Sequence, residues 1–409
     1  MTRFQPALLL LLGLLNATSA LAQSSLRGVV QDSVTRQPLA FASVFLANTT
    51  LGVTTSEQGE FVFPKVPAGN YDVVASYVGY RLAKQTVQVA TSPQQLTLRL
   101  GPTTNRLAEV VVRPNPNRAG DYQKFTELFI GRTSFSRLCR IRNPDDVILD
   151  FDPQENVLTA SAYQYVQVDN AALGYHVKYY GLRFVANFKQ STISFYGQPV
   201  FEEMTPRNER QQQHWLANRA AAYHGSLTHF LRSVYDGRVT DEGFVARRLR
   251  IVPNPRYPRA DSLRRQLLRA RLRAILTAAE NDSLVRWGKE PQGYSMLYTA
   301  PRPLDSLRRK PPDGGRTYIR FRDQLQVTYL REAPDPQYFL RPRPLGTPPR
   351  KPTKEQVSQL MLLEPAIEIQ PNGQLVNPLG LFTDEYWGFE KMGEFLPVNY
   401  LPPASAPGS

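Results

Sequence analysis

The sequence is short of cysteine, and this excludes one route to stability. Cys139 is the only cysteine among 409 residues, so no internal disulfide can form. It lies in an alternating apolar stretch with no histidine or acid close to it in sequence, which predicts a buried, inert thiol. The chain must therefore be stabilised by packed cores, and roughly 390 residues after the N-terminal segment suffice for two or three of them.

Histidine is also scarce, and this argues against a zinc enzyme. The four histidines are His176, His214, His224 and His229. None of them begins a His-x-x-Glu or His-Glu-x-x-His motif. Because an open zinc site needs three protein ligands and a water, the sequence predicts no metal, no cofactor and no catalytic residue.

Long apolar runs are absent except at the N-terminus. Arg3, the apolar run Ala7–Leu15 and the A-x-A sequence Ala20–Ala22 are typical of a secretory signal peptide over residues 1–22. The run is too short for a membrane span, and no later stretch approaches twenty apolar residues. We therefore expect export to the periplasm or to the outer membrane and cell surface, with no transmembrane helix in the mature chain.

Positive charge, in contrast, is abundant. The chain has 49 Lys and Arg against 35 Asp and Glu, a formal net charge of +14. After export the available anionic partners are an envelope protein, an anionic glycan or lipid headgroups, whereas nucleic acid is not expected. The excess can also serve solubility alone, and this simpler interpretation comes first.

The arginines are concentrated in one segment. Between Arg247 and Arg273 there are ten arginines and a single acid, Asp261. A docking face for an anionic ligand would use the following candidate residues: Arg247, Arg248, Arg250, Arg264 and Arg265. The alternative, which the sequence favours, is a solvated helix face whose arginine stems cover apolar surface.

Residues 23–103 have the pattern of a β-sandwich. Strand-like runs recur about every ten residues and are separated by turn signals such as Pro67-Ala68-Gly69. Within the runs apolar residues alternate, as at Phe61 and Phe63 and again at Tyr71, Val73 and Ala75. The pattern predicts an all-β module of about seven strands.

The motifs in this module resemble a known family. They are "GVVQD" at Gly28–Asp32, "QPLAFASV" at Gln37–Val44, "TSEQGEFVF" at Thr55–Phe63 and "VPAGNY" at Val66–Tyr71. Their order is similar to that of the carboxypeptidase regulatory-like domain, and the resemblance implies a transthyretin-like sandwich without chemistry of its own. "RLAEVVVRP" at Arg106–Pro114 resembles the stretch that follows such a module in TonB-dependent outer-membrane receptors.

The rest of the chain is predicted to be α+β. Residues 104–125 are predicted as a linker, 126–400 as an α+β domain of unassigned activity and 401–409 as a tail. The stretch 156–204 is rich in Val, Tyr, Phe and Thr, which predicts three or four antiparallel strands. The chain as a whole is then α+β, with two or three helices in the second domain.

Two helical segments can be placed. From Arg207 the apolar spacing becomes helical, and Gly225-Ser226 either kinks the helix or breaks it, with Ser226 capping a second one. A further helix is predicted over 261–280, capped by Asp261 or Ser262. Its apolar residues cluster within one arc and are Leu268, Leu272, Ile275, Leu276 and Ala279.

Three short motifs in the second domain resemble a group of bacterial envelope proteins. They are "NAALGY" at Asn170–Tyr175, "AYHGSLTHFLR" at Ala222–Arg232 and "LPVNY" at Leu396–Tyr400. Such proteins also carry a carboxypeptidase-like regulatory domain and have no assigned activity. The resemblance implies a genuine second domain, and it does not point to any reaction.

Two functional hypotheses follow. The first is a non-catalytic envelope protein with a binding or structural role at the periplasm or outer membrane, directed at a glycan or another envelope component. The second is a hydrolase acting on glycan or peptide, with a site around His224, His229, Trp215 and Tyr223. Because the histidines are five residues apart, they do not share one helical face, and we expect each to bond a carbonyl or to be exposed. A hydrolase would instead need both rings and a carboxylate in one pocket.

Overall fold

The computed structural model describes residues 23–90, 92–103, 117–312, 315–341 and 351–403. The predicted signal peptide, most of the predicted linker and the end of the predicted tail lie outside them. The chain forms two compact units. Unit 1 comprises Met1–Phe129, Leu138–Trp215 and Leu396–Leu401, and unit 2 comprises Ile130–Arg137, Leu216–Phe395 and Pro402–Ser409. The domain limits predicted from the sequence remain predictions.

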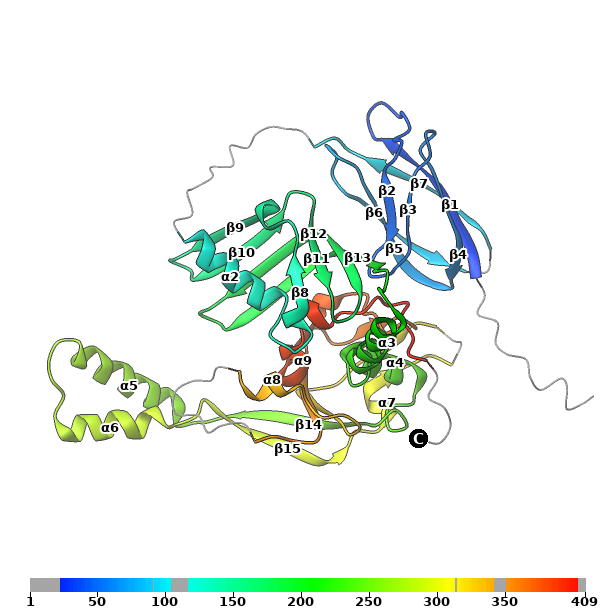
Figure 1. Cartoon of the computed structure of the whole chain (residues 1–409). Helices are drawn as coiled ribbons and strands as arrows, with labels where there is room; N and C mark the ends of the chain where they lie inside the picture. Colours follow the sequence, from blue (N-terminus) through cyan, green and yellow to red (C-terminus); the bar gives the residue numbers. More distant parts are fainter. Residues whose placement is uncertain (1–22, 91, 104–116, 313–314, 342–350, 404–409) are drawn as a thin grey trace, which may run out of the picture. The chain divides into compact units, whose positions relative to one another are not determined.

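The first part of unit 1 is a β-sandwich (Figure 1). One sheet has the order β4-β1-β7, in which β1 is antiparallel to β4 and parallel to β7, and the other has the order β3-β2-β5-β6. The strands are β1 (Gln23–Asp32), β2 (Ser43–Leu46), β3 (Gly52–Thr54), β4 (Glu60–Pro67), β5 (Gly69–Ser76), β6 (Ala83–Val89) and β7 (Gln94–Leu100). The prediction of a sandwich of about seven strands is confirmed.

Alternating apolar side chains build the core of the sandwich. Phe61 and Phe63 on β4 are both buried, and their rings meet edge to face with centroids 6.0 Å apart. Val62 between them is exposed, because successive strand residues point to opposite faces of a sheet. The sequence pattern therefore identified the buried face of this strand correctly.

The second part of unit 1 is a six-stranded antiparallel sheet. Its order is β8-β11-β12-β10-β9, and β13 also pairs with β12. The strands are β8 (Cys139–Ile141), β9 (Val147–Asp152), β10 (Val157–Ala162), β11 (Tyr165–Asn170), β12 (Tyr175–Asn187) and β13 (Thr192–Glu203), with the 3-10 turns η1 (Ser136–Leu138) and η2 (Pro144–Asp146). Cys139 is half-buried and not buried as predicted, because β8 is an edge strand that pairs only with β11.

Helix α2 (Arg118–Phe129) begins inside the segment predicted as a linker. Its composition is polar, but Phe125 and Phe129 are fully buried. The Phe125 ring meets Phe184 at 5.1 Å and the Phe129 ring meets Tyr179 at 5.3 Å, both edge to face. Residues 118–125 of the predicted linker are helical, and the two aromatic contacts explain why a segment of polar composition is ordered here.

The sandwich and the sheet of unit 1 share contacts. The Phe45 ring stacks on the Tyr180 ring with centroids 4.7 Å apart. The C-terminal "LPVNY" motif also returns to the sandwich, where Val398 N donates to Asn48 O at 2.7 Å. In addition, the Asn399 Nδ2 donates to Thr50 Oγ1 at 2.8 Å. This motif is therefore part of the packing of unit 1.

Unit 2 is built on a five-stranded sheet of order β15-β14-β18-β19-β21 and a three-stranded sheet of order β16-β17-β20. The strands are β14 (Phe244–Pro253), β15 (Gly293–Pro301), β16 (Arg308–Arg309), β17 (Thr317–Ile319), β18 (Gln324–Tyr329), β19 (Gln356–Leu362), β20 (Ile367–Ile369) and β21 (Leu381–Asp384). The helices that follow α2 are α3 (Glu209–Tyr223), α4 (Leu227–Asp236), α5 (Tyr257–Arg271), α6 (Ala278–Gly288), α7 (Leu304–Leu307), α8 (Pro336–Phe339) and α9 (Glu385–Phe389). The remaining 3-10 turns are η3 (Pro378–Gly380) and η4 (Met392–Glu394). The α+β class is confirmed, with more helices than the two or three expected.

The apolar face of α4 completes the core of unit 2. Ser226 caps the helix by accepting a hydrogen bond from the His229 backbone, and Gly237 ends it in a left-handed conformation. Phe230, Leu231 and Val234 are buried against residues of the large sheet such as Phe244. Of the two interpretations of Gly225-Ser226, a break followed by a capped second helix is the correct one.

The strands β14 and β15 lead into a helical hairpin that projects from unit 2, which we call the arm and which spans residues 254–292 (Figure 1). The prediction of one helix over 261–280 is wrong. Helix α5 begins at Tyr257, with proline in its first turn, and α6 begins after Thr277. Thr277 and Glu280 form a capping box, which stabilises a new helix start inside the predicted one.

Candidate functional site

The turn between α3 and α4 brings two histidines together. Because Gly225 has a φ of +79° and interrupts the helix, His224 and His229 approach each other with ring centroids 5.5 Å apart. His229 Nδ1 accepts a hydrogen bond from Gly225 N at 3.2 Å. The other ring nitrogen, Nε2, lies 3.3 Å from Glu242 Oε2 and donates to it in this tautomer. Both nitrogens of His229 are therefore occupied.

His229 is buried among aromatic rings. The side chain is 3% exposed, and its ring centroid lies 4.8 Å from Tyr223, 4.9 Å from Phe244 and 5.8 Å from Tyr329. Burial lowers the pKa of His229 to about 4, although the hydrogen bond to Glu242 opposes this. Burial also lowers the pKa of His224. The imidazole of His229 is consequently neutral near pH 7.

The expectation that each histidine bonds a carbonyl or is exposed is wrong for His229. Its partner is the carboxylate of Glu242, which comes from the loop that precedes β14 and also pairs with Arg238. A carboxylate beside one histidine fits part of the hydrolase hypothesis, but no ring nitrogen of His229 is left to accept a proton. Within the described ranges, no group of three or more His, Cys, Asp or Glu could hold a metal ion. The arrangement favours a structural role.

The other two aromatic candidates are held by separate contacts. The Arg232 guanidinium lies over the Tyr223 ring, 5.2 Å from its centroid. Trp215 belongs to unit 1, where its Nε1 donates to Ala171 O at 2.9 Å. Each of these contacts fixes a buried ring, so packing alone accounts for both residues.

We expect His229→Gln to lower the free energy of unfolding by about 2 kcal/mol, because Gly225 N and Glu242 would lose buried partners. Denaturant unfolding followed by fluorescence measures this value. His224→Gln is the matched control and should cost less, because the His224 side chain is only half-buried. Stoichiometric zinc in the purified protein that is lost in the His229 variant would contradict the structural role.

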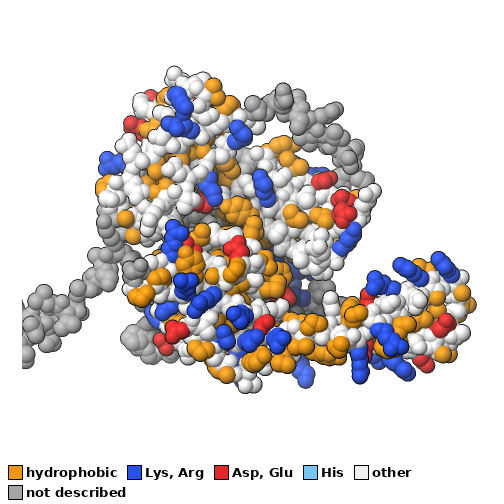
Figure 2. Space-filling view, turned by 180° about the vertical axis from the view of Figure 1, so that it is seen from behind, with side chains coloured by type: hydrophobic (Ala, Val, Ile, Leu, Met, Phe, Trp, Pro, Cys, Tyr) orange, Lys and Arg blue, Asp and Glu red, His pale blue; other side chains and the backbone are white. Residues whose placement is uncertain are grey.

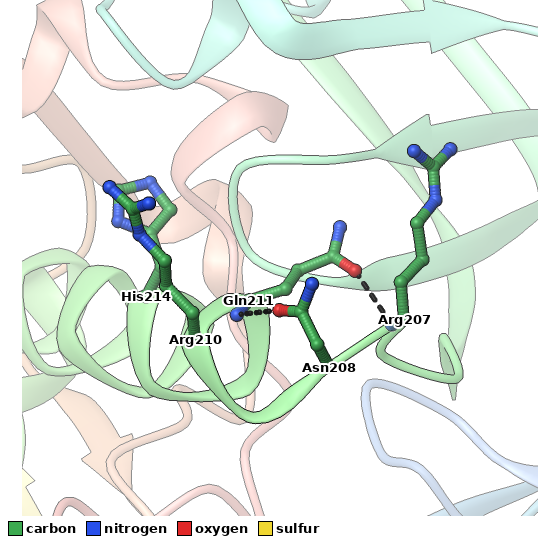
Figure 3. Close-up of a pocket in the computed structure, with 5 residues that line it drawn as sticks. All are labelled: Arg207, Asn208, Arg210, Gln211 and His214. Carbon is green, nitrogen blue, oxygen red and sulfur yellow. Dashed lines mark hydrogen bonds between the residues drawn. The ribbon is translucent and has the colours of Figure 1, made fainter.

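An open depression of about 610 Å³ lies at the start of α3 and was missed by the sequence analysis. It is lined by Arg207, Asn208, Arg210, Gln211 and His214 (Figure 3). Asn208 Oδ1 accepts from Gln211 N at 2.9 Å, and Gln211 Oε1 accepts from Arg207 N at 2.8 Å. These amides cap the helix, and Figure 3 shows Arg207 pointing away from Arg210 and His214. The signal was the capping pattern Asn208-x-x-Gln211, and the side chains do not converge on one point.

Most of the predicted arginine candidates are engaged within unit 2. Arg248 pairs with Asp323 at 2.5 Å, and Arg247 Nε donates to Thr299 O at 3.1 Å. On α5, Arg264 and Arg265 both pair with Asp261, at 2.5 and 2.7 Å. Arg250 is the exception, because it is exposed and has no carboxylate partner among the residues the structure describes.

A second group of arginines lies on the arm. These residues are exposed and have no carboxylate partner within the described part of the chain, and they are Arg256, Arg259, Arg269, Arg271 and Arg273. Between Arg256 and Glu290 the sequence has nine Lys and Arg against four acids. Figure 2 shows Lys and Arg side chains gathered on the arm with hydrophobic side chains among them. Most of the arm's exposed arginines therefore lie next to or on α5 and on the turn that follows it.

The apolar arc predicted for this helix does not form a core. Leu268, Leu272 and Ile275 are 44%, 88% and 99% exposed, and only Leu276 of the predicted arc is buried. Helices α5 and α6 pack together, and the half-buried or buried aliphatic residues of α5 are others: Ala260, Leu263, Leu267 and Ala270. The helical spacing of the predicted arc could not show which apolar residues of the segment are buried.

Comparison with known proteins identifies the N-terminal module. The family model described as a CarboxypepD_reg-like domain matches residues 26–112, which confirms the resemblance of this module to that domain. No curated protein matches the chain. No helix in the described ranges is long and apolar enough to cross a membrane.

Several solved structures are similar to parts of the chain. A chain of a type II cohesin–X-dockerin complex from Acetivibrio cellulolyticus is 23% identical, with 18% of this chain and 51% of that chain covered and a TM-score of 0.17. 3-Chlorocatechol 1,2-dioxygenase from Rhodococcus opacus 1CP is 13% identical, with 20% of this chain and 59% of that chain covered and a TM-score of 0.17. Catechol 1,2-dioxygenase from Acinetobacter sp. ADP1 is 12% identical, with 21% of this chain and 55% of that chain covered and a TM-score of 0.18. The chain thus spans between half and three fifths of these proteins.

Proposed function

We propose that this chain is a non-catalytic binding protein of the cell envelope that recognises an anionic envelope component through the arm. The observation that carries the proposal is the row of exposed arginines on α5 and the following turn that have no carboxylate partner among the described residues, which includes Arg269, Arg271 and Arg273. Unpaired guanidinium groups on a projecting element are free to bind carboxylate, sulfate or phosphate groups. The N-terminal segment typical of a signal peptide supports a place outside the cytoplasm.

The arm fits binding better than the histidine cluster fits catalysis. A general base needs a ring nitrogen that can reach substrate, and both nitrogens of His229 are used inside the protein. The arginines on the arm, in contrast, face water. The module that matches the CarboxypepD_reg-like domain adds a β-sandwich at the N-terminal side of the described chain.

A heparin column tests the proposal with a sulfated glycan as the probe. The chain beginning at Gln23 should be retained, and Arg269→Ser, Arg271→Ser and Arg273→Ser together should weaken binding about tenfold, since each exposed ion pair contributes roughly 0.5 kcal/mol. The matched control removes three exposed arginines of the sandwich, Arg27, Arg81 and Arg99, and so has the same net charge. Equal loss in both variants would show a general charge effect, and no retention of the unmodified chain would refute the proposal.

A further inference from the structure

The turn between α5 and α6 is apolar at its outermost point. Leu272 and Ile275 are 88% and 99% exposed there, and Leu268 on the preceding turn of α5 is 44% exposed. Figure 1 shows that this turn lies at the end of the arm that is farthest from the sheet of unit 2. The half-buried and buried aliphatic residues of α5 are others, namely Ala260, Leu263, Leu267 and Ala270, so these three side chains stay exposed on the arm. An apolar tip of this kind favours contact with an apolar medium.

Arginines alternate with the apolar residues of the tip. Arg269, Arg271 and Arg273 flank Leu272 in sequence, and all three are exposed without a carboxylate partner among the described residues. Arginine can bond phosphate while its apolar stem lies beside acyl chains. The combination of exposed leucine or isoleucine with arginine therefore matches the boundary between headgroups and acyl chains of a membrane that contains anionic lipid.

The acids of the arm are mostly engaged elsewhere. Asp261 pairs with Arg264 and Arg265, the Glu280 carboxylate is bonded in the capping box with Thr277, and Glu290 accepts from Asn254 at 2.9 Å. Asp282 remains exposed on α6. The charge of the tip is thus positive and complements an anionic lipid surface.

We propose that the tip of the arm inserts into the interface of a bilayer that contains anionic phospholipid, with Leu268, Leu272 and Ile275 among the outer acyl carbons and the three arginines at the phosphates. The inference rests on the proposed function, because it names the ligand class for the same arm. A second apolar occupant, another copy of the chain, would leave the arginines facing like charges. A soluble glycan would not use the apolar side chains.

Vesicle sedimentation tests the inference. The chain from Gln23, which lacks the apolar N-terminal run, should sediment with vesicles of phosphatidylglycerol and phosphatidylcholine and much less with phosphatidylcholine alone. Leu272→Ser and Ile275→Ser together should reduce partitioning onto anionic vesicles about 30-fold, since two large apolar side chains leave the acyl region. Because both residues are almost fully exposed, the double variant should keep the melting temperature of the parent protein.

The same variants separate this inference from the proposed function. The double serine variant should still bind heparin, whereas the triple arginine variant should lose both heparin and vesicles. Retention of the unmodified chain on heparin, without binding of that same chain to anionic vesicles, would overturn the lipid inference and leave glycan recognition standing. If the double serine variant still bound both heparin and vesicles, the tip would not insert into lipid. The same conclusion would follow if analytical ultracentrifugation showed a dimer for the unmodified chain and a monomer for the double serine variant.

Discussion

Gly174→Ala is expected to lower the free energy of unfolding of unit 1 by roughly 3 kcal/mol and its melting temperature by about 10 °C. Gly174 has a φ of +70°, and a Cβ at this position would lie 2.5 Å from Trp215 Cε3. The indole cannot retreat, because it is 5% exposed and its Nε1 donates to Ala171 O. The alanine would therefore carry both backbone strain and a steric overlap.

Gly79→Ala is the matched control for this experiment. Gly79 has a φ of +81° in the same unit, but a Cβ there would meet nothing within 4 Å. Its replacement by alanine should lower the free energy of unfolding by about 1 kcal/mol, which is the cost of backbone strain alone. Calorimetry or denaturant unfolding of both variants separates the two contributions, and equal costs would show that Trp215 does not restrict position 174.

Unit 2 is expected to lose stability as the pH rises from 6.5 to 8. Removal from water raises the pKa of Glu332 to about 7 and that of Glu394 to about 8. It also raises the pKa of Glu390 well above its usual value, with the charges of Glu394, Glu332 and Asp335 adding to the effect. The folded state thus holds protons that the unfolded state has released. The stabilisation from these protons is fully present at low pH, and it is lost as the pH rises through the pKa values that the glutamates have in the folded state.

Between pH 6.5 and 8 the expected change in stability comes from the carboxyl groups rather than from His229 or Lys391. The pKa of His229 is lowered to about 4, so its opposite contribution lies between pH 4 and 6.5. Burial lowers the pKa of Lys391 to about 8, and its contribution begins only above that value. One proton taken up on folding changes the free energy by about 1.4 kcal/mol per pH unit, so we expect a loss of about 2 kcal/mol across the window.

Glu394→Gln tests the origin of this pH dependence. One oxygen of Glu394, Oε1, is buried without a hydrogen-bond partner among the described residues. The neutral amide should raise the melting temperature at pH 8 and flatten its dependence on pH. Glu355→Gln, which changes an exposed glutamate of the same unit, should leave both unchanged. A melting temperature that rises from pH 6.5 to 8 in the parent protein would contradict the assignment.

The sequence allowed the sandwich to be predicted more fully than the rest. Each of its strands carries a period of two, and the turn residues between strands are unambiguous, so local pattern and tertiary structure agree. Helix α2 was missed because its burial depends on contacts with Phe184 and Tyr179, which lie far along the chain. Contacts of this kind leave no periodic signal in the segment itself.

The candidate sites show the same limit. The approach of His224 to His229 depends on the left-handed Gly225, and the partner of His229 comes from a loop thirteen residues away. Neither could be read from the spacing of the histidines. On the arm, the arginine-rich segment was recognised, but pairing decided which arginines remain available, and Arg264 and Arg265 proved to be held by Asp261.

The return of Leu396–Leu401 to unit 1 has a consequence for biosynthesis. Unit 1 is interrupted after Trp215 by most of unit 2 and receives its last segment about 180 residues later, so it is a discontinuous domain. The bonds from Val398 to Asn48 and from Asn399 to Thr50 can form only after the ribosome has released the end of this segment. During translation the sandwich and its neighbouring sheet must therefore wait with this surface uncovered while unit 2 is made. A chain cut before Leu396 would keep both sheets of the sandwich but lack these closing bonds.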